Sequence, residues 1–583
     1  MLLRDGELIA MVEQERLSRK RYARGESPSE AVAACLRHGG IGLGDVHTIA
    51  VGWNVPRLCE VEGVRYDRTE FLRWMLGPLW DSRTTVDLRF VEHHVAHAAS
   101  AFYTSGLRHA AILIADGRGE TVSTSLAVGG PSGIEVIKTW GIEASLGHLY
   151  GWVADWVGLS HWGAGKLMGL AAYGRPDQSV PLVATPDGYL VRGSPPPDAP
   201  ARQQFMLSRS RTRAWLRTAT PPFSAGSGDD VMAYADVAAS MQQALEETIL
   251  SLARLAGRLT GADRLVMAGG VALNCAANGR LHRAGLFDEV WVPPFPHDAG
   301  VSLGAALLAE REIAGVAPPP SRLAHPFWAP TPPGLDKPPL RRLSGFEVKQ
   351  LDDASVPDVV ARHLTDGLVV GWWQGRAEVG QRALGARSIL CDPRRWQALS
   401  HVNRLKGREQ WRPLAPALPA SEFGRFFDGE PSALADFMLA AWPVRAGSRA
   451  HIPAAVHVDG SARPQLVHSR HDRFYRLLRA FGERTGVPVL VNTSFNVAGE
   501  PIVLTADDAV DTLLRSDLDA LVLGDLLIRR PTARPLSRAR TAAERPLSFT
   551  PWAAPARTPG GSPLVPAHTE PSGEGSAALV DGQ

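Results

Sequence analysis

The chain has 583 residues, of which 45% are hydrophobic and 21% are charged, and its formal net charge is +2. This length exceeds what one hydrophobic core supports, so we expect about two to four domains in a soluble globular protein. The near-neutral charge excludes a global electrostatic field for nucleic acid or an anionic membrane, so any site for a polyanion must be a local basic cluster.

The cysteines and the apolar segments point to the cytoplasm. The four cysteines form no C-x-x-C pair, which argues against a disulfide framework or a thiolate zinc site. No apolar stretch reaches the length of a membrane span, and the N-terminus lacks the apolar core of a signal peptide. We therefore predict a cytoplasmic protein that does not enter a membrane.

The N-terminal region begins with a predicted β-hairpin over residues 1–15, whose turn lies at residues 4–7. A basic stretch at 15–21 is interpreted as a solvated face. A helix is predicted around 28–38 and a strand near 47–52.

Two histidines and an aspartate form the first candidate metal site. His93 and His97 are four residues apart, so on a helix they project from one face and can hold one divalent metal. Asp116 follows the apolar run 110–115, a predicted buried strand, at a glycine turn. Two imidazoles and a carboxylate suit iron(II), zinc or manganese better than calcium. The alternative that stays open is a pair of partly buried structural histidines. The zinc-protease pattern is less favoured, since it needs a Glu where His94 stands.

Residues 145–174 combine many glycines with three tryptophans. Glycines permit close approach of the backbone to a ligand, and Lys166 could meet a phosphate. A packed, turn-rich segment explains the same pattern equally well.

A nucleotide cradle is predicted next. A long helix over about 234–259 leads into the strand 264–268 and a double-glycine loop that ends at Asn274. Glycines admit a ligand, and the amides at the start of the following helix face its charge. After another strand, Asp298 is either a fourth metal ligand or the N-cap of a helix over 301–310.

A proline-rich segment at 315–345 indicates a linker or a surface wrap. A second α/β unit then begins with a strand at 369–373. Residues 376–412 hold eight arginines and one lysine against three acids. Arginine reads phosphate in bidentate fashion, and this density favours a polyanionic ligand over a solvated face.

Near the C-terminus, a helix at 474–484 and a strand at 487–491 are predicted to deliver Asn492 in a polar segment at the strand's end, where α/β sheets bind ligands. A strand follows at 520–525. From about 531 the chain has no hydrophobic periodicity, and we expect a disordered tail.

Six motifs in a fixed order match one known family. They are His93-His94-x-x-His97-Ala-Ala-Ser-Ala-Phe-Tyr, Asp116-Gly-x-Gly-Glu120, Gly165-Lys-Leu-Met-Gly-Leu-Ala, Gly269-Gly-Val-Ala-Leu-Asn274, Gly380-x-Arg382-Ala-Leu-Gly-x-Arg387-Ser and Asn492-Thr-Ser-Phe-Asn496. Over about residues 1–530 the chain resembles the O-carbamoyltransferases of the nodulation-protein-U and cephem-carbamoyltransferase type, which include antibiotic-tailoring enzymes.

The resemblance implies an α/β fold with two domains. Residues 1–340 would form a domain of the actin/Hsp70/sugar-kinase (ASKHA) type that carries a metal and a nucleotide, and residues 345–530 a YrdC-like domain that makes an acyl-adenylate. Residues 531–583 would be the tail. The implied activity is ATP-dependent transfer of a carbamoyl group from carbamoyl phosphate, through carbamoyl-adenylate, to a hydroxyl of a small-molecule natural product. Mg²⁺ would accompany ATP, and iron(II) is the implied resident metal, with zinc or manganese chemically reasonable.

The resemblance also assigns residues. The activation step would use Arg382, Lys406, Arg463 and Asn492, and the metal would be held by His93, His97, Asp116 and Asp298. The nucleotide would contact Gly117, Gly119, Lys166, Gly269, Gly270, Asn274, Arg387 and Arg412. His94 and His148 are the candidate general bases. No nucleic acid partner is expected, and a homodimer is possible.

The chain departs from the family pattern at two places. Family members begin with a strand and a His-Asp-x-Ser loop before the hairpin, so we expect a start codon assigned too late. Ala164 stands where a Glu is common. Two alternatives therefore stay open: a tRNA threonylcarbamoyl-type modification enzyme, which the net charge and the domain order argue against, and a degenerate nucleotide-binding protein without catalysis.

Overall fold

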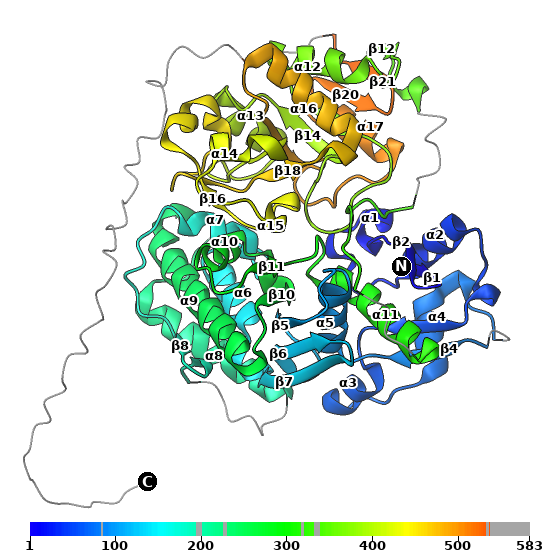
Figure 1. Cartoon of the computed structure of the whole chain (residues 1–583), viewed down its shortest axis with the longest axis vertical. Coiled ribbons are helices and arrows are strands. Elements are labelled where there is room, and N and C mark those ends of the chain that lie inside the picture. Colours follow the sequence, from blue (N-terminus) through cyan, green and yellow to red (C-terminus); the bar gives the residue numbers. More distant parts are fainter. Residues whose placement is uncertain are drawn as a thin grey trace, which may run out of the picture.

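The computed structural model describes residues 1–82, 85–193, 201–224, 230–315, 320–330, 339–531 and 536. The predicted tail over 531–583 therefore lies almost wholly outside the described residues, as does part of the predicted linker at 315–345. The described chain forms two lobes, each built on its own sheet (Figure 1).

The first lobe contains a five-stranded sheet with the strand order β11-β10-β5-β6-β7. Strand β10 runs parallel to β11 and β5, whereas β5, β6 and β7 are antiparallel. All six residues of β5 are buried, as expected for a central strand read as one apolar run. The bounds are β5 (Ala110–Ala115), β6 (Val122–Gly130), β7 (Gly133–Gly141), β10 (Arg264–Ala268) and β11 (Glu289–Trp291).

Helices α5 (His93–Tyr103) and α9 (Ala235–Thr260) both contact strand β5. Helix α11 (Val301–Ala314) packs along α5 because Gly304 has no side chain: a Cβ there would lie 1.8 Å from the carbonyl oxygen of Ala96. The predicted long helix and the strand after it are confirmed. Close packing of α11 on α5 brings the start of α11 beside the histidines.

The N-terminal hairpin is confirmed as β1 (Leu2–Arg4) paired with β2 (Glu7–Ala10). The other predicted elements of this region are also present, as α2 (Ser29–Gly39) and β3 (Thr48–Val51), which pairs with β4 (Asp87–Phe90).

The second lobe holds an eight-stranded mixed sheet with the order β12-β21-β20-β13-β14-β19-β15-β18. Side chains alternate between its faces: Trp372 and Val522 pack with one pair of helices, whereas Trp373 and Leu521 pack with the other pair. The first pair is α12 (Val356–Asp366) and α16 (Asp472–Thr485), and the second is α13 (Gln397–Leu405) and α17 (Ala506–Arg515). The strands are β12 (Glu347–Gln350), β13 (Val370–Trp373), β14 (Arg387–Cys391), β15 (Ala415–Pro419), β18 (Gln465–Val467), β19 (Leu490–Ser494), β20 (Ala520–Leu523) and β21 (Leu526–Arg529). The predicted α/β fold class is confirmed.

Two stretches differ from what the sequence suggested. The turn-rich alternative left open for residues 145–174 is not observed, because they contain helices α6 (Leu146–Trp156) and α7 (Ala164–Ala171). Glycine serves there for packing, since a Cβ at Gly151 would lie 2.6 Å from the His161 ring. The strand predicted at 487–491 starts later, as β19, because Pro488 cannot donate to a ladder. Asn492 therefore lies inside the strand, opposite Leu390 of β14.

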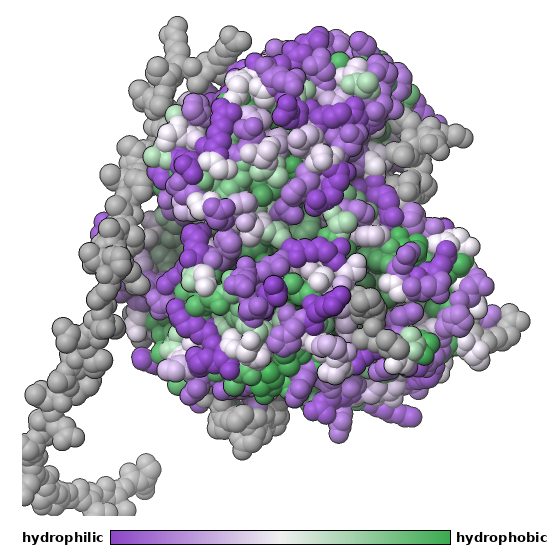
Figure 2. All heavy atoms as spheres, in the orientation of Figure 1, coloured by the Kyte–Doolittle hydropathy of each residue, from purple (hydrophilic) through white to green (hydrophobic). Residues whose placement is uncertain are grey.

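Residues 320–330 join the two lobes. Their backbone bonds to Tyr103 and Thr104 of the first lobe, to Met11, and to Ala377 of the second lobe. In Figure 2, apolar side chains are visible in the hollow between the lobes, while hydrophilic ones cover most of the remaining face. Among the described residues, no helix is both long and apolar enough to cross a membrane.

Candidate metal and nucleotide site

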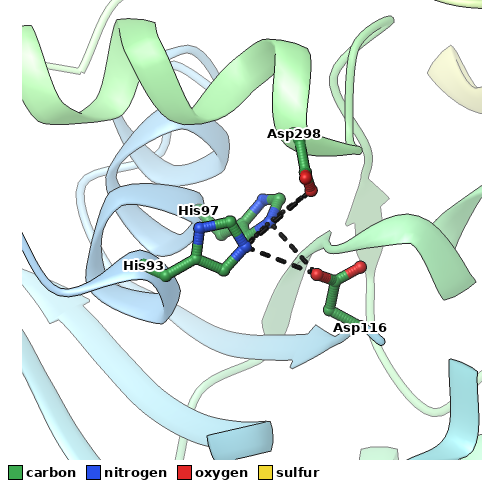
Figure 3. Close-up of side chains that lie close together, drawn as sticks. All are labelled: His93, His97, Asp116 and Asp298. Carbon is green, nitrogen blue, oxygen red and sulfur yellow. Dashed lines mark hydrogen bonds and ion pairs between the residues drawn. The ribbon is translucent and has the colours of Figure 1, made fainter. Parts of the chain in front are cut away.

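Four predicted metal ligands come together between α5, the end of β5 and the start of α11 (Figure 3). His93 Nε2 lies 3.1 Å from His97 Nε2 and 3.4 Å from Asp116 Oδ2. Asp298 Oδ1 lies 3.8 Å from His93 Nε2 and 3.7 Å from His97 Nε2. One ligand atom from each of the four residues lies within 4.8 Å of the others. The predicted helical spacing of the histidines is confirmed.

The surroundings fix how these groups face the centre. His93 Nδ1 lies 3.1 Å from the carbonyl oxygen of Gly52, which can only accept, so Nδ1 carries a proton and the Nε2 edge of the ring faces the other three ligands. Burial opposes ionisation of Asp116, but hydrogen bonds from His93 and His97 outweigh it and hold the pKa of this carboxyl well below its usual range. Two imidazole nitrogens and two carboxylate oxygens in one cluster fit a borderline divalent metal.

Asp298 does not cap a helix. Residues Asp298–Gly300 form a 3₁₀ turn, and α11 has Gly300 at its N-cap without a side-chain hydrogen bond. Of the two roles left open by the sequence, the structure supports membership of the metal cluster.

Sequence analysis assigned no role to Glu120, although this residue ends the motif Asp116-Gly-x-Gly-Glu120. Its carboxylate is buried and accepts hydrogen bonds from the backbone N–H groups of His93, at 3.2 Å, and Asn54, at 2.7 Å. A carboxylate at the first turn of α5 also complements the helix dipole. Glu120 therefore fixes the start of the helix that carries both histidines.

The double-glycine loop is joined to the metal cluster. Gly269 has φ +89°, and a Cβ there would lie 2.2 Å from the carbonyl oxygen of Ala115. Gly270 donates its N–H to Asp116 Oδ1 at 2.7 Å. Asn274 caps α10 (Cys275–Arg283) and exchanges two amide hydrogen bonds with Gln242. The loop thus holds the carboxylate that faces the metal ligands.

The two candidate bases differ in position. His94 turns toward β6, where Nδ1 lies 2.9 Å from Ser125 Oγ, and a Cβ at Gly119 would lie 3.0 Å from its ring. His148 lines the cavity described below and rests against Gly117. Burial lowers the pKa of His94 to about 3 and that of His148 to about 4, so both rings are neutral at pH 7.

A second cluster, here called the cation cluster, gathers in the C-terminal lobe. It consists of Arg382, Lys406, Arg408, Arg412 and Arg463, of which the last was found from the family resemblance and lies outside the basic stretch. Burial and the neighbouring Arg463 lower the pKa of Arg382 to about 9, and burial and nearby arginines hold that of Lys406 well below its usual range. Such mutual depression marks a region of positive potential that a polyanion would relieve.

Several buried atoms near this cluster have no partner among the described residues: Arg382 Nε, Arg408 Nη2 and Asn492 Oδ1. Lys406 Nζ donates to Ser494 Oγ at 3.1 Å and Asn496 Oδ1 at 2.9 Å. Asn492 donates to the carbonyl oxygen of Ala383, next to Arg382. Unpartnered buried polar atoms are costly, so they are consistent with a polar ligand here.

The other cations of 376–412 do not join the cluster. Arg387 is fully buried and donates to the carbonyl oxygens of Leu504, Gln374, Ala386 and Gly375. Arg394 and Arg395 pair with Asp392. Arg387 lies outside the cavity lining, and its contacts stabilise the fold, so its position lends no support to nucleotide binding.

One cavity of about 3010 Å³ reaches both clusters. Its lining includes Asp116 and Asp298 from the first lobe, and Arg382, Arg463 and Asn492 from the second. Lys166 also lines it and pairs with Glu409 of the other lobe. The two predicted sites therefore open onto one continuous cavity, which the sequence did not reveal.

Comparisons with known proteins follow this division of the chain. The family model described as "Carbamoyltransferase N-terminus" matches residues 61–307, and that described as "Carbamoyltransferase C-terminus" matches residues 361–530. The chain is 36% identical to nodulation protein NolNO of Sinorhizobium fredii, over 94% of this chain and 81% of that protein. It is also 36% identical to nodulation protein NolO of Bradyrhizobium diazoefficiens, over 76% of this chain and 79% of that protein.

A likeness to solved structures is weak. Full-length HypF in its phosphate- and nucleotide-bound form matches with a TM-score of 0.29 and 17% identity, covering 42% of this chain and 46% of that chain. The score is too low to assign a fold, so the ASKHA and YrdC-like assignments stay predictions.

Proposed function

Since this chain belongs to the carbamoyltransferase family, we propose that it moves a carbamoyl group from carbamoyl phosphate, through carbamoyl-adenylate, to a hydroxyl of a small-molecule natural product in an ATP-dependent reaction. Family membership favours this enzyme over a non-catalytic nucleotide-binding protein. The observation that carries the proposal is the single cavity that reaches both the metal ligands and the cation cluster.

Activation is assigned to the cation cluster. Carbamoyl phosphate and ATP are both polyanions, and holding them together requires several fixed cations. Arg382 and Arg463 supply these charges from the cavity wall, and Lys406, outside the lining, donates to Ser494 and Asn496 of that wall. Asn492 Oδ1, which has no partner among the described residues, can accept from the carbamoyl NH₂ group. Atom balance gives one carbamoyl-adenylate, one pyrophosphate and one inorganic phosphate, with one water consumed.

Transfer is assigned to the centre formed by His93, His97, Asp116 and Asp298. A divalent metal bound there, iron(II) by family resemblance, would supply a Lewis acid for phosphate oxygens. Gly270 and Gly117 lie beside this centre on the cavity wall, where glycine permits close approach of a nucleotide. The neutral His148 also lines the cavity, and its Nε2, which is buried without a partner among the described residues, is the proposed acceptor of the hydroxyl proton.

A shared cavity suits this chemistry because carbamoyl-adenylate is hydrolysable, and one continuous cavity lets it pass between the two sites without release into bulk solvent. We assign the transfer site to a domain spanning 1–340 and the activation site to a domain spanning 345–530, of the ASKHA and YrdC-like types.

The test is pyrophosphate release from ATP that depends on carbamoyl phosphate and needs no acceptor. Transfer is then measured by mass detection of a carbamoyl adduct across a panel of hydroxylated acceptors. Pyrophosphate release without carbamoyl phosphate, or carbamoylation without ATP, would contradict the proposal.

A further inference from the structure

The start of helix α1 (Gln14–Ser18) grips a single glycine of the C-terminal lobe. Glu13 Oε1 accepts the N–H of Gly380 at 2.6 Å, and Arg16 Nη2 donates to the carbonyl oxygen of the same residue at 2.5 Å. Arg16 Nε lies 3.2 Å from Glu13 Oε2, so the two side chains also pair with each other. Both polar backbone groups of Gly380 are therefore bound by residues more than 360 positions away in the sequence.

The hydrogen bond from Arg16 to Gly380 is buried, so it holds this particular residue specifically. Arg16 is 1% exposed, although arginine is seldom buried without partners. Gly380 has φ +100°, and a Cβ there would lie 2.2 Å from the carbonyl oxygen of Pro294. The glycine is thus held on one side by the α1 segment and pressed on the other against the first lobe.

The residues before Gly380 are held in the same way. Val379 donates its N–H to the carbonyl oxygen of Pro326, at 2.9 Å, and Arg376 Nη2 donates to that of Ile9, also at 2.9 Å. All of these partners lie outside residues 361–530, which match the C-terminal family model. Hydrogen bonds from residues outside 361–530 therefore set the path that the chain takes into the cation cluster.

Arg382 follows Gly380 by two residues and lines the cavity. Its Nη2 donates to the carbonyl oxygen of Leu273, in the double-glycine loop of the first lobe, at 3.2 Å. A shift of the Gly380 peptide would therefore move the guanidinium relative to Arg463 and Asn492. Misplacement by about 1 Å in such a site can cost about 100-fold in rate.

We propose that Glu13 and Arg16 are positioning residues for Arg382, so that the N-terminal segment sets the geometry of the carbamoyl phosphate and ATP site in the other lobe. This role rests on the proposed function of the cation cluster. The geometry of the activation site then depends on residues of both lobes.

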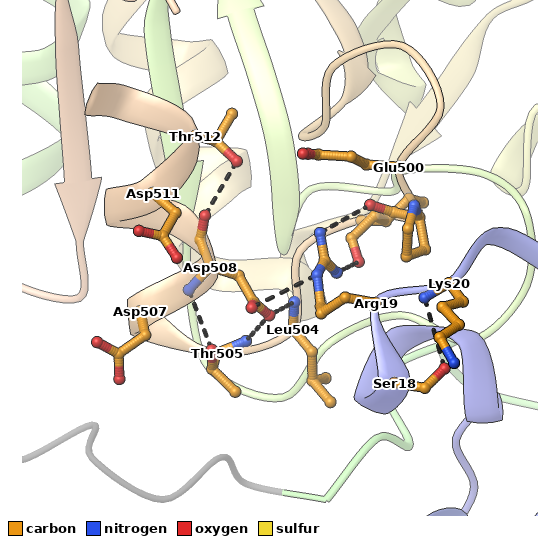
Figure 4. A network of polar contacts seen from close by, with 12 residues as sticks. Ser18, Arg19, Lys20, Glu500, Leu504, Thr505, Asp507, Asp508, Asp511 and Thr512 are labelled. Atoms are coloured by element: carbon orange, nitrogen blue, oxygen red, sulfur yellow. Dashed lines mark hydrogen bonds and ion pairs between the residues drawn. The ribbon is translucent and has the colours of Figure 1, made fainter. Parts of the chain in front are cut away.

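A general docking role for α1 is the competing explanation, and Arg19 separates the two. Arg19, directly after the helix, donates to the carbonyl oxygens of Ile502 at 2.8 Å and Pro501 at 3.2 Å, and its Nε lies 3.5 Å from Asp508 Oδ1 (Figure 4). It joins the same segment to the same lobe but does not touch Gly380. Arg19→Ala is therefore the matched control.

The experiment uses the full-length protein and acceptor-free pyrophosphate release. The double variant Glu13→Ala/Arg16→Met removes the grip without leaving an unpaired buried charge. We expect its kcat/KM for carbamoyl phosphate to fall by about 10- to 100-fold, with unchanged metal content. Arg19→Ala should stay within about twofold of wild type.

Coupling to Arg382 is tested in an Arg382→Lys background. If the pair acts through Arg382, the double variant lowers the rate there much less than in the wild type, because the two losses are not additive. Fully additive losses, or an equal loss in Arg19→Ala, would overturn the inference. A wild type without pyrophosphate release would instead refute the proposed function itself.

Discussion

Lys166 and Glu409 form an ion pair across the two lobes, with Nζ 2.7 Å from Oε1 although the two residues are 243 positions apart in the sequence. Lys166 lies in α7 and Glu409 in the segment that carries Arg408 and Arg412. The lysine predicted to meet a phosphate is thus paired with a carboxylate that no sequence pattern places beside it.

This pair predicts a pH dependence of stability. Burial raises the pKa of Glu409, but the hydrogen bond from Lys166 outweighs it and lowers the pKa below the usual 4.5. A carboxyl with a lower pKa in the folded state stabilises the fold above pH 4.5 and loses this contribution as the pH falls through the folded value. Both side chains are about one-third exposed, so solvent screening keeps the effect small.

We expect Glu409→Gln to melt slightly below wild type from pH 5 to pH 8, with the difference shrinking in more acidic buffer. Thermal unfolding across this range measures it. A difference that grows toward low pH would show that the assigned sign is wrong.

The metal cluster predicts a separation of the two half-reactions. His97→Ala removes one nitrogen ligand, so metal per chain measured by mass spectrometry should fall and carbamoyl transfer should be lost. Acceptor-free pyrophosphate release should persist, because the cation cluster is intact. His109→Ala, which changes an exposed histidine next to β5, serves as the control and should keep its metal.

Arg463 predicts the opposite pattern. Arg463→Ala removes a charge from the cation cluster and should reduce pyrophosphate release by at least about 100-fold, while metal content stays at the wild-type level. Arg479→Ala removes an arginine that is 53% exposed on α16 and should have no effect. If Arg463→Ala loses metal and His97→Ala loses pyrophosphate release, the assignment of the two steps is reversed.

The two adjacent glycines of the nucleotide loop should respond differently to alanine. At Gly269, positive φ and the contact with the Ala115 carbonyl oxygen oppose any side chain, so Gly269→Ala should lower the melting temperature or prevent folding. At Gly270, a Cβ would lie 3.0 Å from Asp116 Oδ1, so Gly270→Ala should leave a folded protein that binds metal less tightly. Melting temperature and metal content, measured together, check both, and equal behaviour of the two variants would contradict this view of the loop.

Local patterns made part of the fold and three of the four residues of the metal cluster predictable. The spacing of His93 and His97 places both on one face of a helix, and the uniformly apolar run before Asp116 describes a buried strand. Glycine-rich segments were harder, because the glycines of 145–174 fit a ligand-binding or turn-rich segment equally well and in the structure allow helices to pack closely. Asn492 was placed beyond its strand because the apolar run ends before it, whereas pairing with β14 extends β19 past the apolar residues.

The sequence by itself determined the N-terminal hairpin, the central apolar strands, the long helix, the pair of histidines and the density of arginine, because each depends on neighbours within a few residues. Only the tertiary structure decided which charges act together. Asp298 joins the histidines through the packing of α11 on α5. Arg387 donates its hydrogen bonds to backbone carbonyls, whereas Arg463 enters the cation cluster. Glu13 and Arg16 hold Gly380 from the far end of the chain. These choices depend on contacts between segments hundreds of residues apart, whose geometry is set by burial and close packing rather than by local periodicity.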